Sequence, residues 1–118
     1  MRVEQIMSRT VISLRPDATV ATARAIFRQR NIHHLVVTDG RKVIGTLSYR
    51  ELSGHGEETP VSATMNRDFI TATPSTTLKE AASLMLRHAA GCLPVVDEGI
   101  VGILTTTDLM RNLAGADS

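Results

Sequence analysis

The residues best placed to do chemistry stand where an apolar run leads directly into a predicted helix. Thr105 and Asp108 follow the run Gly102, Ile103 and Leu104. The first turn of such a helix presents backbone N–H groups that have no intrahelical partner, and these groups attract anions. The Thr-x-x-Asp spacing is equally typical of an N-terminal helix cap, which needs no ligand. From the residues alone both interpretations stay open.

A second copy of this arrangement lies earlier in the chain. Ser48 and Glu51 have the same spacing and follow an apolar run that ends at Leu47. The repetition indicates that the position has a structural role in both copies, which does not exclude a binding role.

Signatures of catalysis are absent from the sequence, which has no Walker loop, no GxGxxG, no nucleophile elbow and no HExxH-like pair. His33 and His34 are adjacent, so on a strand they would point to opposite faces and could not easily share a metal ion. Cys92 has no obvious activating base beside it in the sequence, and we interpret it as a small buried side chain. We expect no enzyme, no metal site and no resident cofactor.

Composition narrows the range of partners. Among 118 residues, 13 Lys and Arg face 12 Asp and Glu, which gives a net charge of +1, and aromatic residues make up 3%. General nucleic-acid binding needs a basic excess, and single-strand binding needs stacking rings. No run approaches the roughly 18 apolar residues of a membrane span. We expect neither a nucleic-acid polymer nor a membrane as partner, and the lone cysteine and polar amino terminus predict a cytoplasmic location.

An internal repeat positions the two candidate sites. Pairs at a spacing of 58 positions, or of one fewer after a deletion in a turn, include Met7 with Met65, Pro16 with Pro74, Leu35 with Leu93 and Gly45 with Gly102. The repeats occupy residues 1–57 and 58–118. A unit of about 59 residues buries only roughly 60% of its unfolded surface, so we expect the two copies to fold together.

Each repeat changes its hydrophobic period in the same order, which predicts strand, helix, strand, strand, helix and an α+β fold class. The predicted strands are 10–14, 35–38 and 43–47 in the first repeat, and 68–72, 93–96 and 100–104 in the second. Asp39 and Gly40 between two of these strands are typical of a tight hairpin. Apolar residues at successive positions of the hairpin strands indicate sheets that are covered on both faces.

The doubled pattern resembles a tandem pair of CBS domains, named for cystathionine beta-synthase, over practically the entire chain. In the second repeat it comprises Met65, Ile70-Thr71, Pro74, a helix from Leu78, Leu93-Pro94-Val95-Val96-Asp97 and Gly102-Ile103-Leu104-Thr105-x-x-Asp108-Leu109. The resemblance implies a Bateman module, in which two β-α-β-β-α repeats related by a pseudo-twofold axis pack sheet to sheet with their helices outside. It also implies a homodimer, an effector protein, and an adenosine-containing ligand such as AMP, ADP, ATP or S-adenosylmethionine in clefts between the repeats.

The resemblance also assigns residues to the first of these clefts. The family's Gly-h-h-Thr-x-x-Asp signature falls on Thr105 and Asp108, where the Asp accepts hydrogen bonds from the ribose hydroxyls and the Thr hydroxyl reaches the ribose or phosphate. A carboxylate that accepts from a vicinal diol makes strong charge-assisted bonds. The other residues assigned to this cleft are Met7, Ile12, Ile32, His33 and Ile103.

The symmetry-related cleft departs from the signature. Its residues would be Ser48, Glu51, Met65, Ile70, Ala90 and Gly91. Glu51 stands where the signature has Asp and is one methylene longer, so we expect this cleft to be weaker, altered in ligand or empty. A ligand-free scaffold for protein interaction or dimerisation is the alternative function, because the capping interpretation alone accounts for Thr105 and Asp108.

Overall fold

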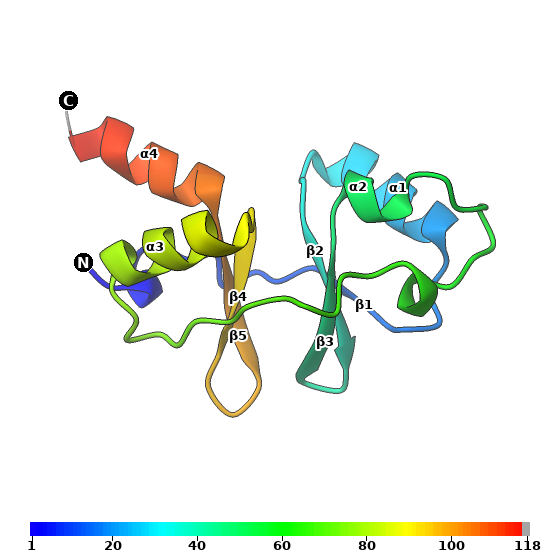
Figure 1. Ribbon diagram of the computed structural model, residues 1–118, viewed down its shortest axis with the longest axis horizontal. Helices are drawn as coiled ribbons and strands as arrows, with labels where there is room; N and C mark the ends of the chain where they lie inside the picture. The colour runs from blue at the N-terminus through cyan, green and yellow to red at the C-terminus, as the bar shows by residue number, and fades with distance from the viewer. Residues whose placement is uncertain (117–118) are drawn as a thin grey trace. The chain divides into compact units, whose positions relative to one another are not determined.

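The computed structural model describes residues 1–116 and divides into two compact units (Figure 1). Unit 1 contains Met1–Val11 and the chain from Ile70 on, and unit 2 contains Ile12–Phe69. The compact units therefore differ from the sequence repeats at the amino terminus, because the first residues of the chain fold with the second repeat. No helix in the described part of the chain is long and apolar enough to cross a membrane.

Unit 2 holds the elements of the first repeat. These are β1 (Ser13–Leu14), α1 (Val20–Arg30), β2 (Leu35–Asp39), β3 (Lys42–Leu47) and α2 (Tyr49–Leu52), followed by the 3-10 helix η2 (Val61–Ala63). In its sheet, β2 lies between β1, which is parallel to it, and the antiparallel β3. Leu35, Val36 and Val37 are all fully buried, as the successive apolar residues predicted.

Unit 1 repeats the plan with a longer final helix. It contains the 3-10 helix η1 (Val3–Gln5), α3 (Leu78–His88), β4 (Cys92–Val96), β5 (Ile100–Thr105) and α4 (Thr106–Ala116). β4 and β5 form an antiparallel hairpin, and α3 contacts both β4 and α4 (Figure 1). Both units mix helices and strands, which confirms the predicted α+β class.

The strand predicted at 68–72 is wrong in its length, because only one parallel bridge forms there, between Ala72 and Val95. The next bond of a parallel ladder would need an N–H donor at position 94, which is a proline and has none. Unit 2 has Val36 at the equivalent position, and there β1 pairs with β2 as a strand. A single proline therefore explains why the described part of unit 1 has two strands where unit 2 has three.

Each unit is completed by a segment from the start of the other repeat. In unit 1 the Val3 N–H donates to the carbonyl of Thr76 at 2.8 Å, and in unit 2 the Val61 N–H donates to the carbonyl of Ala18 at 2.7 Å. Val3 and Val61 are fully buried in the hydrophobic cores of their units. The amino-terminal segment, blue in Figure 1, is therefore part of the core of unit 1.

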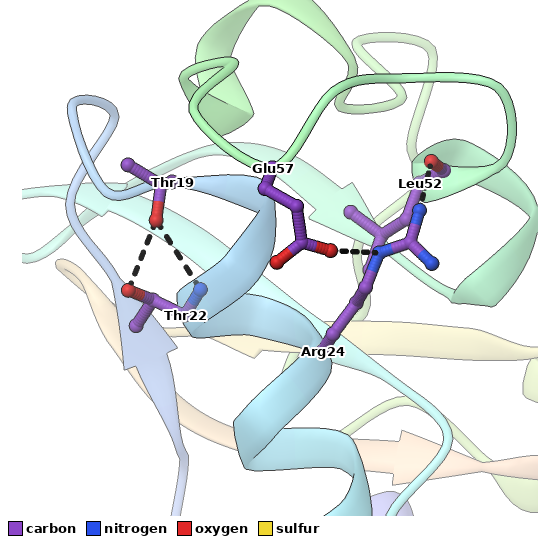
Figure 2. Close-up of polar contacts among 5 residues, drawn as sticks. All are labelled: Thr19, Thr22, Arg24, Leu52 and Glu57. Carbon is purple, nitrogen blue, oxygen red and sulfur yellow. Dashed lines mark hydrogen bonds and ion pairs between the residues drawn. The ribbon is translucent and has the colours of Figure 1, made fainter.

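Arg24 of α1 holds the chain that follows α2 (Figure 2). One Nη of its guanidinium donates to the carbonyl of Leu52 at 3.1 Å, and its Nε lies 3.9 Å from the Glu57 carboxylate. The same stretch of backbone serves the start of α1, because the Val20 N–H donates to the Thr59 carbonyl at 2.9 Å. The connection between the repeats is thus an ordered part of unit 2.

Candidate functional site

The candidate site in unit 1 is a hydrogen-bonded cap at the junction of β5 and α4. Oδ2 of Asp108 accepts from the N–H of Thr105 at 2.8 Å and from its hydroxyl at 3.0 Å. The Asp108 N–H in turn donates to Oγ1 of Thr105 at 3.2 Å. The predicted cap is therefore confirmed. Because the carboxylate accepts both of these bonds through Oδ2, Oδ1 can accept from a ligand without breaking the cap.

Unit 2 builds the same cap with a longer acid. Oε1 of Glu51 accepts from the N–H of Ser48 at 2.6 Å and from its hydroxyl at 2.8 Å. The Ser48 hydroxyl oxygen accepts from the Arg50 N–H at 3.3 Å. Despite its extra methylene, Glu51 therefore accepts from the same two kinds of donor as Asp108, a backbone N–H and a side-chain hydroxyl.

The residues predicted for the first cleft come from both units. Unit 1 holds Met7, Ile103, Thr105 and Asp108, and unit 2 holds Ile12, Ile32 and His33. Within unit 1, the Ser8 N–H donates to the Ile103 carbonyl at 2.9 Å. That bond places the segment of Met7 beside the strand that ends in the Thr105 cap.

The residues predicted for the second cleft are also divided. Unit 2 holds Ser48, Glu51 and Met65, and unit 1 holds Ile70, Ala90 and Gly91. The backbones of Thr46 and Asn66 exchange hydrogen bonds of 3.0 and 2.9 Å, which places Met65 beside β3. This repeats the relation of Met7 to β5 in unit 1.

Each of these methionines has a packing role that the sequence analysis missed. Met7 is 8% exposed and lies against Gly102, where a Cβ atom would be 2.6 Å from its sulfur. Met65 is 7% exposed and contacts Gly45 in the same way. The signal was present in the sequence, because both the methionines and the glycines align between the repeats.

The pKa of His34 is affected by burial, by its neighbour His33 and by Glu51 of the Ser48 cap. Burial lowers the pKa of His34 below its ordinary value, the neighbouring His33 lowers this pKa further, and the carboxylate of Glu51 opposes both effects. His34 therefore favours the neutral form in the folded protein. Within residues 1–116 no three His, Cys, Asp or Glu side chains are grouped so that they could hold a metal ion.

A separate apolar groove of about 540 Å³ lies between α3 and α4 of unit 1. Its apolar lining includes Leu78, Ala82, Met85, Leu86, Leu109, Met110 and Leu113. Among the residues predicted for the clefts, Ala90 lines this groove, whereas Thr105 and Asp108 do not. The groove and the Asp108 cap are therefore distinct features of the same unit.

Comparison with known sequences assigns both repeats to one domain family. The family model for the CBS domain matches residues 3–57 and 61–115. A curated relative, the CBS domain-containing protein YhcV of Bacillus subtilis, is 28% identical over 98% of this chain and 88% of its own length. The chain spans only 43% and 23% of the length of two other curated relatives that it matches.

Solved structures agree with the family model. The CBS domain pair of protein MJ0100, in complex with 5-methylthioadenosine and S-adenosyl-L-methionine, matches with a TM-score of 0.91 and 26% identity over 98% of both chains. The cytosolic domain of the Mg2+ channel MgtE, in complex with ATP, matches with a TM-score of 0.82 and 28% identity over 94% of this chain and 48% of that one. This chain therefore belongs to the CBS domain family and is a tandem pair of CBS domains.

Proposed function

We propose that this CBS pair is a regulatory module that binds an adenosine-containing ligand and passes the bound state to an effector protein. The observation that carries the proposal is the Asp108 carboxylate, which Thr105 holds through one oxygen at the start of α4. The ligands in the two similar solved structures, S-adenosyl-L-methionine with 5-methylthioadenosine and ATP, all contain adenosine. A ribose diol is thus the ligand feature that Asp108 recognises.

The chemistry of the cap suits such a ligand. Charge-assisted hydrogen bonds from two ribose hydroxyls to one carboxylate are strong and directional. The start of α4, a helix of 11 residues, helps to balance phosphate charge through its dipole. The assignment of Met7, Ile12, Ile32, His33 and Ile103 to the same ligand stays a prediction from the family resemblance.

The proposed output is a shift between conformations rather than a chemical step. A ligand that binds one conformation more tightly increases the population of that conformation, and a partner that reads it senses the ligand. The module acts as a homodimer, has no catalytic role and works in the cytoplasm. AMP, ADP, ATP and S-adenosylmethionine are the candidate ligands.

Calorimetric titration with AMP, ADP, ATP, S-adenosylmethionine and NAD tests the proposal. At least one should bind and should raise the melting temperature, because binding to the folded state alone stabilises it. Asp108→Asn keeps an oxygen that can accept from Thr105 but removes the charge. We expect it to weaken binding by at least about 10-fold, the factor for one charge-assisted bond of about 1.5–3 kcal/mol.

Glu51→Gln is the matched control in the other repeat, because it makes the same change at the equivalent cap. It should leave the affinity within about twofold, a change of under 0.5 kcal/mol. Equal loss from both variants would contradict the assignment of one principal site to Asp108. If nucleotide-free protein binds none of the five compounds, the ligand-free scaffold is the correct function.

A further inference from the structure

The sheet of unit 2 holds two buried threonines whose hydroxyl groups have no hydrogen-bond partner in the protein. Thr38 is 8% exposed and Thr46 is 7% exposed, and no other polar or charged residue in the described range 1–116 is buried to this degree. Within that range neither hydroxyl bonds to another residue. A buried hydroxyl without a partner costs free energy, so most such groups in proteins are bonded. The two threonines therefore mark a place where a bond to another molecule is favoured.

Both hydroxyl oxygens can be reached from outside the protein. Among the buried side-chain nitrogens and oxygens of residues 1–116, only Nε of Arg24 is sealed from solvent and also lacks a hydrogen-bond partner. The oxygens of Thr38 and Thr46 lack a partner too, so they must keep some contact with solvent. A ligand can therefore approach them.

Thr46 lies on the same side of β3 as the cap of unit 2. Leu47, the next residue, belongs to the core of this unit, so alternation along the strand puts Thr46 and its cross-strand partner Val36 on the opposite face. Ser48 follows with an extended backbone, φ −132° and ψ 179°, and therefore points to the same side as Thr46. Two residues of a strand span about 7 Å. The Thr46 hydroxyl is thus a near neighbour of the cap that holds Glu51.

Unit 1 has apolar residues at both of these positions. Ile103 aligns with Thr46, and Val96 aligns with Thr38. The relation to the cap is the same, because Ile103 stands two residues before Thr105. The two caps therefore hold their carboxylates alike but differ in what lies beside them, an apolar side chain in unit 1 and a free hydroxyl in unit 2.

We propose that the Thr46 hydroxyl hydrogen-bonds to the purine base of a ligand whose ribose binds Glu51, and so determines which base unit 2 accepts. The inference rests on the proposed function, from which it takes the class of ligand. Glu51 accepts from Ser48 through Oε1 alone, which leaves Oε2 for a ribose hydroxyl. A threonine hydroxyl both donates and accepts, so it can bond to a ring nitrogen or to an amino group of the base. Ile103 can do neither, so unit 1 contacts its ligand at this position by apolar packing only.

Calorimetric titration with adenosine tests the inference in a protein that carries Asp108→Asn, which weakens the cap of unit 1. Adenosine is the probe because it contains only the base and the ribose. In this background Thr46→Val should weaken binding about 3- to 10-fold, the range for one hydrogen bond between neutral groups. Thr46→Ser keeps the hydroxyl and should bind within about twofold of the parent protein.

Thr38→Val is the matched control, because it removes the other buried hydroxyl of the same sheet, at a position further from the cap. It should also stay within about twofold of the parent protein. Equal loss from Thr38→Val and Thr46→Val would overturn the assignment to Thr46. So would a Thr46→Val protein that binds adenosine as tightly as its parent, or an Asp108→Asn protein that binds no adenosine.

Thermal melts without ligand distinguish a binding role from a structural one. Thr46→Val should melt no lower than its parent, because no bond within the protein is lost and an apolar group of the same shape replaces the hydroxyl. A lower melting temperature that Thr46→Ser restores would show that the hydroxyl is bonded within the protein, which would overturn the inference.

The same titrations separate this inference from the proposed function. If Asp108→Asn weakens ligand binding to the wild-type protein but Thr46→Val has no effect, the proposed function stands and the inference fails. If Asp108→Asn has no effect and Thr46→Val removes adenosine binding, the inference stands and the assignment of the principal site to Asp108 fails. A wild-type protein that binds neither adenosine nor any of the five compounds overturns both.

Discussion

Units 1 and 2 begin their last helix in the same way and then diverge. Thr105 with Asp108 in unit 1, and Ser48 with Glu51 in unit 2, form equivalent caps. Beyond the cap, α4 continues for 11 residues, whereas α2 ends after four. The cap is therefore common to both repeats, and the length of the helix that follows it is where they differ.

The two units also differ in what lies between their two helices. In unit 2 the side chains of α1 contact α2 directly, since Arg24 reaches the carbonyl of Leu52 and the ring of Phe27 lies 4.8 Å from that of Tyr49. Unit 1 leaves the equivalent space apolar and open. One copy of a duplicated fold can thus fill the space beside its helices with its own side chains while the other leaves an open apolar groove there.

Removal of residues 1–8 should give the largest difference between the units. Val3 is fully buried and Met7 is 8% exposed in the core of unit 1. At about 1.5–3 kcal/mol for each buried side chain, the deletion should destabilise unit 1 by about 3–6 kcal/mol. Hydrogen exchange should then show faster exchange in β4 and α3, which lie far from the deletion in sequence. Faster exchange confined to β2 and β3 would contradict the assignment of this segment to unit 1.

The sequence predicted the hairpins, the helices and both caps because each depends on residues close together in the chain. Asp39-Gly40 and the Thr105-x-x-Asp108 spacing are local signals of this kind. The position of Val3 in unit 1 is not local, since nothing in residues 1–8 indicates which repeat they pack against. The groove escaped prediction for a similar reason, because an apolar stripe that contains Leu86 does not show how much of it the core covers.

For the candidate site, too, the sequence predicted only the contacts between residues that are close together in the chain. The spacing of Thr105 and Asp108 was sufficient to predict their mutual bonds, which the structure confirms. It could not show that Glu51 folds back onto the same kinds of donor, because the path of one extra methylene depends on local packing. The shortening of the strand before Pro74 was predictable in principle, since Pro94 is visible in the sequence and lacks an N–H.

Substitution of the aligned glycines should give the next largest difference. A Cβ at Gly102 would lie 2.6 Å from the Met7 sulfur and 2.9 Å from the carbonyl oxygen of Ser8, so backbone must move. Gly102→Ala should therefore cost about 1–3 kcal/mol of unfolding free energy. At Gly45 the three nearest atoms all belong to the side chain of Met65 and none to the backbone, so Gly45→Ala should cost less. Urea denaturation of both variants measures this order, and equal costs would contradict it.

Acid should weaken unit 2 through His34. The pKa of His34 is lowered by burial and by His33, with Glu51 opposing, so the unfolded chain binds a proton more readily than the folded chain. This contribution to stability is complete above the unfolded pKa of about 6.5 and is lost as the pH falls through the lower folded value. The equivalent residue of unit 1 is Cys92, so His34→Cys should flatten the fall in melting temperature between pH 7 and 5. An unchanged pH profile in the variant would assign the acid sensitivity to another group.

The smallest expected difference lies at the C-terminal ends of α1 and α3. Ala89 follows α3 with φ 51°, and Asn31 follows α1 with the same φ, a left-handed conformation that Asn tolerates better than Ala. Ala89→Gly should therefore stabilise the protein by about 0.5–1 kcal/mol, because glycine adopts this conformation without a Cβ penalty. Asn31→Gly should change stability less, and thermal melts of the two variants would compare them directly. If Asn31→Gly stabilised the protein as much as Ala89→Gly, the side chain of Asn31 would offer no relief of the strain that Ala89 carries.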